Sequence, residues 1–352
     1  MSVISDIQNN LKNNEAAIIV SPSNRFYITG FSSSDGYVVI TGESAVFLTD
    51  SRYIESARQK VKSCSVTLLK NTYADLTAAL GKSENVYIET GYITVEQLEK
   101  LEKSLPQFCF LRDNMLDNII TNSRIIKNER EIENIIAAQK LTDDTFNYIL
   151  NNIKVGKTER EIALDMEFFM RKCGSEGVSF DFIVVSGKNS SLPHGVPTDK
   201  KIENGDFVTM DFGAVVNGYR SDMTRTVAVG RVTQKQKQVY DTVLKAQTAA
   251  IKCAKAGKVC KDIDKIARDI IKDAGYGENF GHGLGHGVGI DIHESPCFNT
   301  RDETVLKPNT VITVEPGIYI ENQFGVRIED MIIIGDNGNT DITKSSKELI
   351  VL

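Results

Sequence analysis

No apolar run in the 352 residues approaches the ~18 residues that a membrane-spanning helix requires. The first ten residues also lack the basic-then-apolar order of a signal peptide. None of the six cysteines belongs to a C-x-x-C pair, and the net charge of −6 comes without any cluster of Lys or Arg. We therefore expect a cytoplasmic protein with reduced thiols that binds neither membranes nor nucleic acid.

The length of the chain predicts two domains, because 352 residues exceed what one core usually holds. In the first part, short β-rich runs alternate with helical patterns, which indicates a small α/β domain. The expected strands lie at 16–20, 36–40, 45–49 and 64–69, and the expected helices at 2–12, 52–62 and 94–104. This part has no histidine, so we expect a structural role or an oligomer contact. We place the domains at 1–120 and 121–352, with a junction at 119–128.

The second part repeats one order of elements, a pair of helices followed by a β-rich region. Helices are expected at 129–150, 158–173, about 234–256 and 260–274, and β-rich regions at 179–231 and from 281 onward. Thr158 and Glu161 form a capping-box pattern at the start of the second helix. This order predicts two halves that each give their helices to one face of a curved sheet.

The few histidines of the chain are concentrated in this second part. All four fall in three short motifs and stand at His194, His282, His286 and His293. Four carboxylates occupy similarly marked motifs, at Asp211, Asp222, Glu315 and Glu329. One imidazole and four carboxylates suit a pair of divalent cations, and the other imidazoles can handle protons and substrate. This set predicts a two-metal hydrolase.

A predicted hairpin brings two of the acids together. Asn217-Gly218 between β-rich runs is a strong type I′ turn signal. A turn there pairs residue 216 with 219, 213 with 222 and 211 with 224, which puts Asp211 and Asp222 diagonally on one face. Two carboxylates aimed at one point repel unless a cation joins them. Gly213, opposite Asp222, leaves space that an ion or substrate would fill.

A second hairpin is expected around a three-residue loop at 321–323. It pairs residue 320 with 324 and therefore Glu315 with Glu329, and it puts Arg327 on the same face. Like charges directly opposed in a sheet are destabilising. A cation bound between the two carboxylates would remove this repulsion and form a metal site. The glycine-rich segment around His282 and His286 predicts close approach of the backbone to an ion or ligand. A phosphate loop is the less favoured alternative, because no Lys-Ser/Thr follows.

These motifs resemble the pita-bread metallopeptidase family (M24), which includes Xaa-Pro aminopeptidases, prolidases and methionine aminopeptidases. The resemblance covers nearly the whole chain. It implies an α/β (α+β) protein with a creatinase-like N-terminal domain at 1–120 and a pita-bread catalytic domain at 121–352. In matching motifs it implies that the metal ligands are Asp211, Asp222, His286, Glu315 and Glu329.

The resemblance also implies roles for single residues. Asp211 would chelate one ion, Asp222 and Glu329 would bridge both, and His286 and Glu315 would complete the other. Catalysis would involve Glu315, His293 and His194, and substrate would be bound by His194, His282, His293 and Arg327. The expected cofactor is two divalent ions per chain, Mn²⁺ first, with Co²⁺ or Zn²⁺ as alternatives. A homodimer is also implied.

The expected function is an Xaa-Pro aminopeptidase, which hydrolyses the bond between an N-terminal residue and a following proline. A water bridging two ions ~3.5–4 Å apart would supply the nucleophile. The segments Tyr27–Phe31 and Phe47–Tyr53 resemble the N-terminal domain of the proline-directed branch. The alternatives are an Xaa-Pro dipeptidase (prolidase), a methionine-type aminopeptidase and a pita-bread binding module without catalysis. A sugar- or phosphate-directed two-metal hydrolase fits the ligands but not Arg327 and His282.

Overall fold

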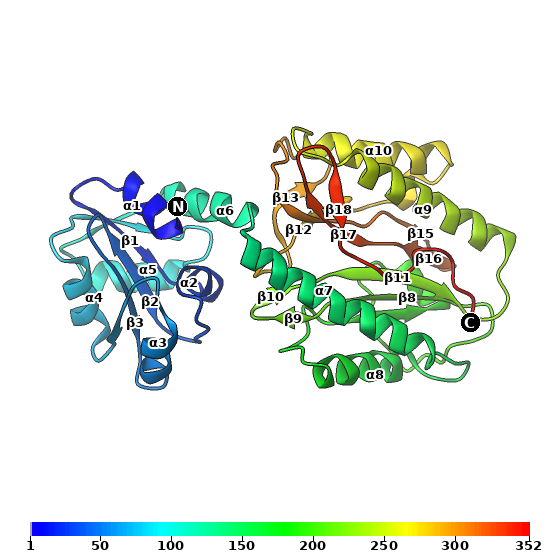
Figure 1. The fold of residues 1–352 in the computed structure, drawn as a ribbon, viewed down its shortest axis with the longest axis horizontal. Coiled ribbons are helices and arrows are strands. Elements are labelled where there is room, and N and C mark those ends of the chain that lie inside the picture. Colours follow the sequence, from blue (N-terminus) through cyan, green and yellow to red (C-terminus); the bar gives the residue numbers. More distant parts are fainter. Residues whose placement is uncertain (1) are drawn as a thin grey trace. The chain divides into compact units, whose positions relative to one another are not determined.

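The computed structural model describes residues 2–352 and divides the chain into two compact units. One unit ends at Arg124, and the other spans Ile125–Leu352 (Figure 1). Within the described residues, no helix is long and apolar enough to cross a membrane.

The first unit is built on a six-stranded sheet with the order β4-β3-β2-β1-β5-β6. Its strands are β1 (Glu15–Ile19), β2 (Tyr37–Thr41), β3 (Ala45–Thr49), β4 (Ser65–Leu68), β5 (Asn85–Ile88) and β6 (Cys109–Leu111). Its helices are α1 (Val3–Asn10), α2 (Pro22–Thr29), α3 (Ile54–Lys60), α4 (Thr72–Leu80), α5 (Val95–Ser104) and α6 (Met115–Ile125). β1 runs parallel to β5 and antiparallel to β2.

All four strands and all three helices expected in this unit are confirmed, but five elements were not predicted. They are α2, α4, α6, β5 and β6. The expected junction at 119–128 lies largely in α6, which continues to Ile125. β1 is buried on both faces: Ala17 and Ile19 pack in one apolar cluster, and Ala16 and Ile18 in the other. Such a strand gives no alternation of apolar and polar residues.

The first half of the second unit begins with two long helices, α7 (Glu129–Leu150) and α8 (Glu159–Lys172), as expected. The capping box of Thr158 and Glu161 is confirmed. A sheet with the order β11-β8-β7 follows. Its strands are β7 (Ile183–Ser186), β8 (Phe207–Phe212) and β11 (Met223–Ala228), and the small hairpin β9 (Val215–Val216) and β10 (Tyr219–Arg220) extends it.

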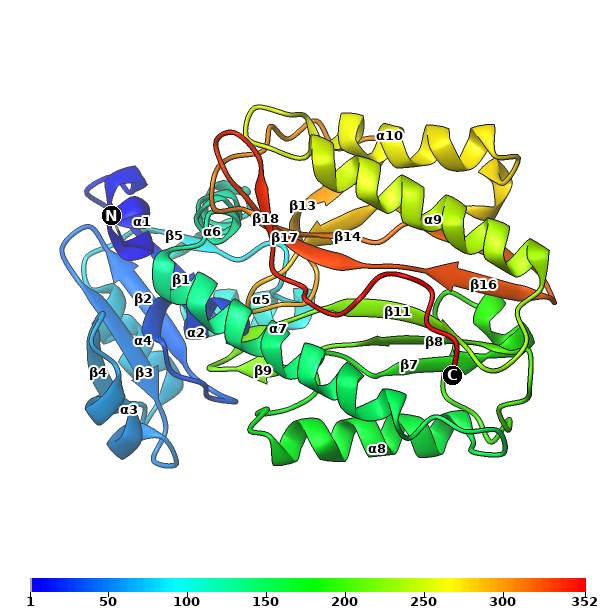
Figure 2. The same cartoon turned by 45° about the vertical axis from the view of Figure 1, so that its right-hand side comes forward.

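The second half repeats this order with α9 (Gln234–Cys253) and α10 (Cys260–Asp273). Its sheet has the order β13-β12-β14-β17-β18. The strands are β12 (Gly285–Gly287), β13 (Glu294–Phe298), β14 (Val311–Val314), β17 (Asp330–Ile334) and β18 (Asn339–Asp341), with the hairpin β15 (Gly317–Ile320) and β16 (Phe324–Arg327). Figure 2 shows α7 and α8 on one side of the strands of this unit and α9 and α10 on the other. The predicted fold class is confirmed.

The register of the first predicted hairpin is confirmed. Val216 pairs with Tyr219, and Asp211 pairs with Thr224. Asn217 and Gly218 have φ values of 48° and 77°, as a type I′ turn requires. The space expected at Gly213 is absent, however. A Cβ on Gly213 would lie 1.9 Å from the carbonyl oxygen of Ser221, so the neighbouring backbone fills it.

The register of the second hairpin is confirmed as well. Ile320 pairs with Phe324 and Gly317 with Arg327, and Val314 pairs with Asp330 in the adjoining sheet. Glu315 and Glu329 therefore stand opposite each other between these two ladders. A loop of three residues, with Asn322 at a φ of 56°, sets this register.

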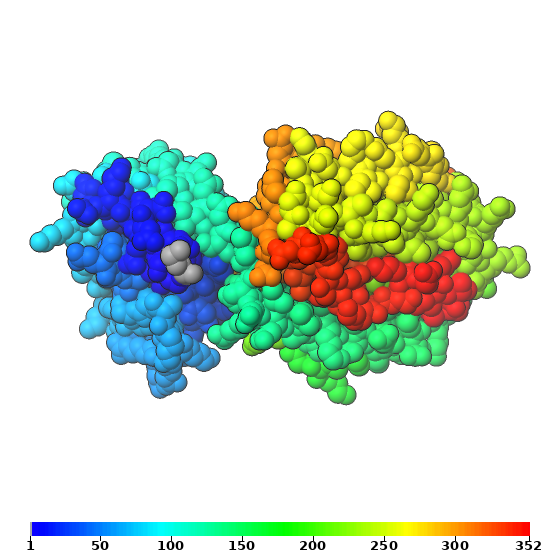
Figure 3. All heavy atoms as spheres, turned by 45° about the horizontal axis from the view of Figure 1, so that its top comes forward, coloured from blue at the N-terminus to red at the C-terminus, as the bar shows by residue number. Residues whose placement is uncertain are grey.

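Residues 343–352 join the two halves of the second unit. Figure 3 shows them in red between segments coloured green and yellow. On the first half, the Asp143 carboxylate of α7 accepts from the N–H of Ser345 at 2.8 Å, and Leu352 donates to Ala228 at 2.9 Å. On the second half, the hydroxyl of Tyr240 in α9 donates to the carbonyl of Lys347 at 3.0 Å. The same short segment thus holds both halves.

We expect Gly213→Ala to destabilise the second unit. The new methyl group would overlap the Ser221 carbonyl and approach Ser179 Cβ at 2.9 Å, so the strands that carry Asp211 and Asp222 must move. The loss in free energy of unfolding should be about 2 kcal/mol or more, measured by urea denaturation. Gly177→Ala is the matched control, because a Cβ there meets open space. Equal stability of the two variants would contradict this reading.

Candidate metal centre

Five predicted ligands lie at or beside strand ends of the second unit. Asp211 is in β8, Asp222 precedes β11, and His286 is in β12. Glu315 follows β14, and Glu329 lies between β16 and β17. Both hairpins thus contribute a pair of acids, and the histidine comes from a third segment.

Three of these residues converge closely. Asp222, His286 and Glu329 each offer one ligand atom, and these atoms lie within 4.8 Å of one another. His286 Nε2 is 3.6 Å from Asp222 Oδ2 and 3.4 Å from Glu315 Oε1. The other ring nitrogen, Nδ1, lies 3.1 Å from the carbonyl of Gly287. Donation to this carbonyl fixes the tautomer and leaves the lone pair of Nε2 facing the carboxylates.

The carboxylates have oxygen atoms that no protein group satisfies. Asp211 Oδ1, Asp222 Oδ1 and Glu329 Oε1 are buried and accept no hydrogen bond from the described residues. A buried charge without a partner costs several kcal/mol, which a cation would offset. Oxygen donors with one imidazole nitrogen form a set that Mn²⁺, Co²⁺ and Zn²⁺ accept. The residues present therefore fit divalent ions.

Burial and mutual repulsion shift the pKa values of these groups. Burial, and then the charges of Glu329, Asp211 and Glu315, raise the pKa of Asp222 well above its usual range. Burial raises the pKa of Glu315 to about 8 and lowers that of His286 to about 4. Without a cation the carboxylates resist ionising together, whereas His286 is held neutral, in the form that binds metal.

Arg327 makes close contact with one predicted ligand. Its Nη2 lies 2.5 Å from Asp211 Oδ2, and its other donors reach Thr224 Oγ1 at 3.0 Å and Tyr319 Oη at 2.8 Å. Asp211 keeps Oδ1 for another partner. The sequence predicts that Arg327 shapes a substrate pocket; in the structure, it also orients an acid of the centre.

All nine predicted site residues line one cavity of about 950 Å³. His282 Nε2 lies 3.0 Å from Tyr319 Oη, and burial lowers the pKa of His282 to about 4. The ring of His293 packs edge-on against that of His286, with 4.5 Å between centroids. His194 lies on the exposed wall of the cavity. The catalytic and binding roles of these residues stay predictions.

Three residues that received no role from the sequence form hydrogen bonds to the predicted site residues. Thr224 Oγ1 donates to Glu329 Oε2 at 2.7 Å. Thr313 Oγ1 accepts from the N–H of His286 at 3.0 Å and lies 3.3 Å from Glu315 Oε1. Tyr319 Oη links His282 to Arg327. Thr224 and Thr313 each stand two residues from a predicted metal ligand, so each shares a strand face with that ligand. This spacing is the sequence signal that could have identified them.

The glycines around His286 allow close packing of strands, and their predicted approach to an ion or ligand stays a prediction. A Cβ on Gly285 would lie 2.0 Å from the Thr313 carbonyl oxygen, and one on Gly287 2.6 Å from the Ser295 carbonyl oxygen. Within the described residues, their backbone is therefore pressed against neighbouring strands. Close strand packing, which brings His286 towards the acids, requires these glycines.

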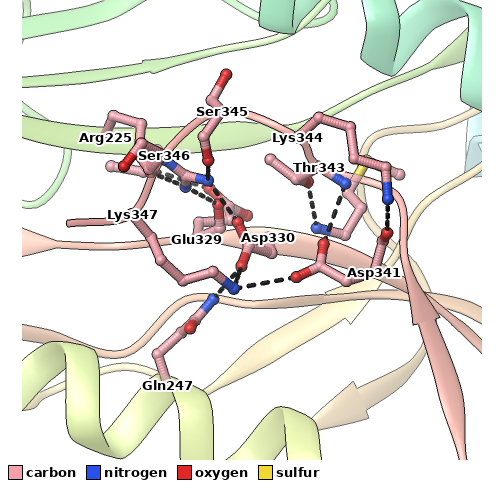
Figure 4. A network of polar contacts seen from close by, with 12 residues as sticks. Arg225, Gln247, Glu329, Asp330, Asp341, Thr343, Lys344, Ser345, Ser346 and Lys347 are labelled. Carbon is pink, nitrogen blue, oxygen red and sulfur yellow. Dashed lines mark hydrogen bonds and ion pairs between the residues drawn. The ribbon is translucent and has the colours of Figure 1, made fainter.

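A buried charge network lies behind Glu329 (Figure 4). Arg225 donates to the Glu329 carbonyl and to Asp330 Oδ1, each at 2.6 Å, and Gln247 and Lys347 donate to Asp330 Oδ2. Although burial opposes ionisation, Arg225 and Lys347 hold the pKa of Asp330 below its usual range. The network fixes the backbone that carries Glu329, and through Lys347 it includes the segment 343–352.

Comparisons with known proteins agree with this geometry. The family model described as metallopeptidase family M24 matches residues 133–336, and the creatinase/prolidase N-terminal domain matches residues 8–126. The chain is 41% identical over 337 residues to an Xaa-Pro dipeptidase of Pyrococcus furiosus, which covers 96% of this chain and 95% of that protein.

Solved structures give the same relationship. An Xaa-Pro dipeptidase from Bacillus anthracis superposes with a TM-score of 0.95 at 39% identity and covers 99% of both chains. An X-Pro aminopeptidase from Thermotoga maritima superposes with a TM-score of 0.90 at 35% identity and covers 99% of this chain and 100% of that one.

We expect Asp222→Asn to lower the metal content of the protein. The substitution removes one carboxylate charge from a cluster whose oxygens lack other partners. After dialysis against Mn²⁺, elemental analysis should give about two ions per chain for the unmodified protein and one or fewer for the variant. Asp199→Asn, an exposed acid paired with Arg160, is the control. Unchanged metal content in a folded Asp222→Asn protein would remove this residue from the ligand set.

Proposed function

Because the chain belongs to metallopeptidase family M24, we propose that it is an Xaa-Pro dipeptidase, which hydrolyses dipeptides with proline in second position. The sequence motifs favour an Xaa-Pro aminopeptidase, with the dipeptidase as the alternative. Relatives named Xaa-Pro dipeptidase, at 41% and 39% identity over nearly the whole chain, favour that alternative.

The single cavity that holds all nine predicted site residues supports this proposal most strongly. It brings acids that fit divalent cations next to imidazoles at which substrate and protons can be handled. We propose that Asp211, Asp222, His286, Glu315 and Glu329 hold two divalent ions. When bound, such ions lower the pKa of a water molecule and polarise the scissile carbonyl.

The side chains of the cavity have separate roles in proton transfer, oxyanion stabilisation and orientation. Glu315 Oε1 lies near His286 and Thr313, whereas Oε2 has no hydrogen bond to the described residues. Oε2 is therefore the atom that takes a proton from the attacking water and later returns it to the prolyl nitrogen. His293 and His194 stand on the cavity wall, where they donate to the developing oxyanion. Tyr319 keeps His282 and Arg327 in fixed orientations.

Arg301 supports a preference for dipeptides. It lines the same cavity, it is exposed, and its guanidinium has no ion pair or hydrogen bond within the described residues. The other two arginines of the cavity are engaged, Arg268 with Asp264 and Arg327 with Asp211. The prolyl carboxylate of a dipeptide, which a longer substrate replaces with an amide, would give Arg301 a partner.

An Xaa-Pro aminopeptidase is the second candidate function, since the chain also resembles the X-Pro aminopeptidase of Thermotoga maritima. The Mn²⁺ preference, the homodimer, the cytoplasmic location and the domain limits of 1–120 and 121–352 stay predictions.

We expect the protein to cleave an Xaa-Pro dipeptide with a kcat/KM at least tenfold above that for an Xaa-Pro-Yaa tripeptide, and to leave Met-Ala-Ser intact. A chelator should abolish turnover, and added Mn²⁺ should restore it, because the ligand cluster lacks other partners. Chromatographic detection of the released amino acids measures all three substrates. A preference for the tripeptide would favour the aminopeptidase, and activity that survives chelation would exclude a metallopeptidase.

We expect Arg301→Gln to raise the KM for an Xaa-Pro dipeptide about tenfold, the effect of losing one charge-assisted hydrogen bond. The KM for the corresponding dipeptide amide should not change, because that substrate has no carboxylate. Arg231→Gln, another exposed arginine of the second unit, serves as the control. Equal effects on acid and amide would show that Arg301 does not recognise the carboxylate.

A further inference from the structure

The first unit contains a second cavity, of about 210 Å³, at the carboxyl ends of β1 and β5. The two strands are parallel neighbours, but the chain leaves them in opposite directions. It passes from β1 through α2 to β2 on one side, and from β5 through α5 to β6 on the other. This is a topological switch point, the place where open α/β sheets bind their ligands. The cavity lies there: Val20 and Pro22 follow β1, and Tyr92 and Ile93 follow β5.

Hydrogen-bond donors without protein acceptors surround this cavity. Its walls include the side chains of Tyr37, Tyr73 and Tyr92, whose hydroxyls make no hydrogen bond to the described residues. Burial, with the charge of Asp35 next, raises the pKa of Tyr37, so its hydroxyl keeps its proton at neutral pH. Lys100 also lines the wall, with Glu96 as its partner.

A buried guanidinium adds positive charge on one side of the cavity. Arg25 is only 4% exposed and donates to the carbonyls of Val20, Ser33 and Gly36. Its Nε has no partner, and it forms no ion pair within the described residues. Burial lowers the pKa of Arg25 despite the nearby charge of Asp35, because desolvation outweighs that attraction. The guanidinium therefore has no directly bonded counter-charge, although the charges of Asp35 and Glu89 act on it.

Buried Glu89 does not supply this counter-charge by direct contact. Its two oxygens accept from the N–H groups of Val20 and Ser21 and from the side chains of Ser21 and Asn24. The carboxylate is thus engaged at the start of α2. The cavity therefore has charges of both signs on its walls, Arg25 and Lys100 as cations and Asp35 as an anion. It also has hydroxyl donors and an apolar surface formed by Val20, Ile93 and Leu101.

We propose that this cavity binds a small organic carboxylate with an apolar body, of the size of a free amino acid. The carboxylate accepts from the tyrosine hydroxyls and from the ammonium group of Lys100, and the apolar body packs on Val20, Ile93 and Leu101. Asp35 at the rim pairs with exposed Arg52 through Oδ2 and can receive an ammonium group as well, which favours an α-amino acid over its deaminated analogue. This proposal goes beyond the peptidase function and does not depend on it.

The test is isothermal titration calorimetry on the full chain with L-leucine, 4-methylpentanoate and inorganic phosphate as probes. We expect saturable binding of L-leucine, with 4-methylpentanoate binding more weakly because it has no ammonium group. Tyr37→Phe and Tyr92→Phe should each weaken binding about tenfold, since each removes one hydroxyl donor to a charged group. Substitutions at Arg25 are avoided because its three carbonyl partners make it part of the fold.

Two controls decide where a probe binds. Tyr148→Phe removes a hydroxyl from a ring that stacks on Phe169 in the second unit, and it should leave the affinity unchanged. Arg301→Gln should also leave it unchanged. Suppose that Arg301→Gln abolishes binding, whereas Tyr37→Phe and Tyr92→Phe retain it. The probe would then bind in the cavity of the second unit, and the proposal would be overturned. Absence of carboxylate binding, or binding of phosphate alone, would overturn it as well.

Discussion

Repulsion among carboxylates is the constraint on which the second unit depends. The four predicted acidic ligands line one cavity, with the guanidinium of Arg327 against Asp211, and three of the acidic oxygens are buried without a donor among the described residues. In such surroundings the acids stay partly protonated or acquire cations. The two paired hairpins, the crowded glycine backbone at Gly285 and Gly287 and the hydroxyls of Thr224 and Thr313 all hold the acids in place despite this cost.

Much of this arrangement could be predicted, because local turn chemistry sets long-range register. Asn217-Gly218 positions Asp222 relative to Asp211, and the three-residue loop at 321–323 positions Glu329 relative to Glu315. The sequence does not reveal what fills the space beside a glycine. The gap at Gly213 contains the Ser221 carbonyl.

The sequence motifs do not distinguish a dipeptidase from an aminopeptidase. The family resemblance assigns the acids, His282 and Arg327 to motifs of the proline-directed enzymes in general, so these residues predict the chemistry and leave the length of the substrate open. Arg301 lies in the connection between β13 and β14 and belongs to no motif; only the cavity shows that it faces the same space. The first unit offers a parallel case. Lacking histidine, it suggested a structural role, although its tyrosines surround a cavity of their own.

The segment 343–352 affects how the second unit would come apart. It follows β18 of the second half, yet its last residues pair with Ala228 of β11 in the first half, and its Lys347 neutralises Asp330. A protease cut in the connection between β11 and α9 would therefore produce two fragments that remain associated. The two halves would thus behave like subunits. The fragments would separate only when the contacts of this segment and the direct ion pairs between the halves, Arg225–Asp330 and Arg327–Asp211, are all broken.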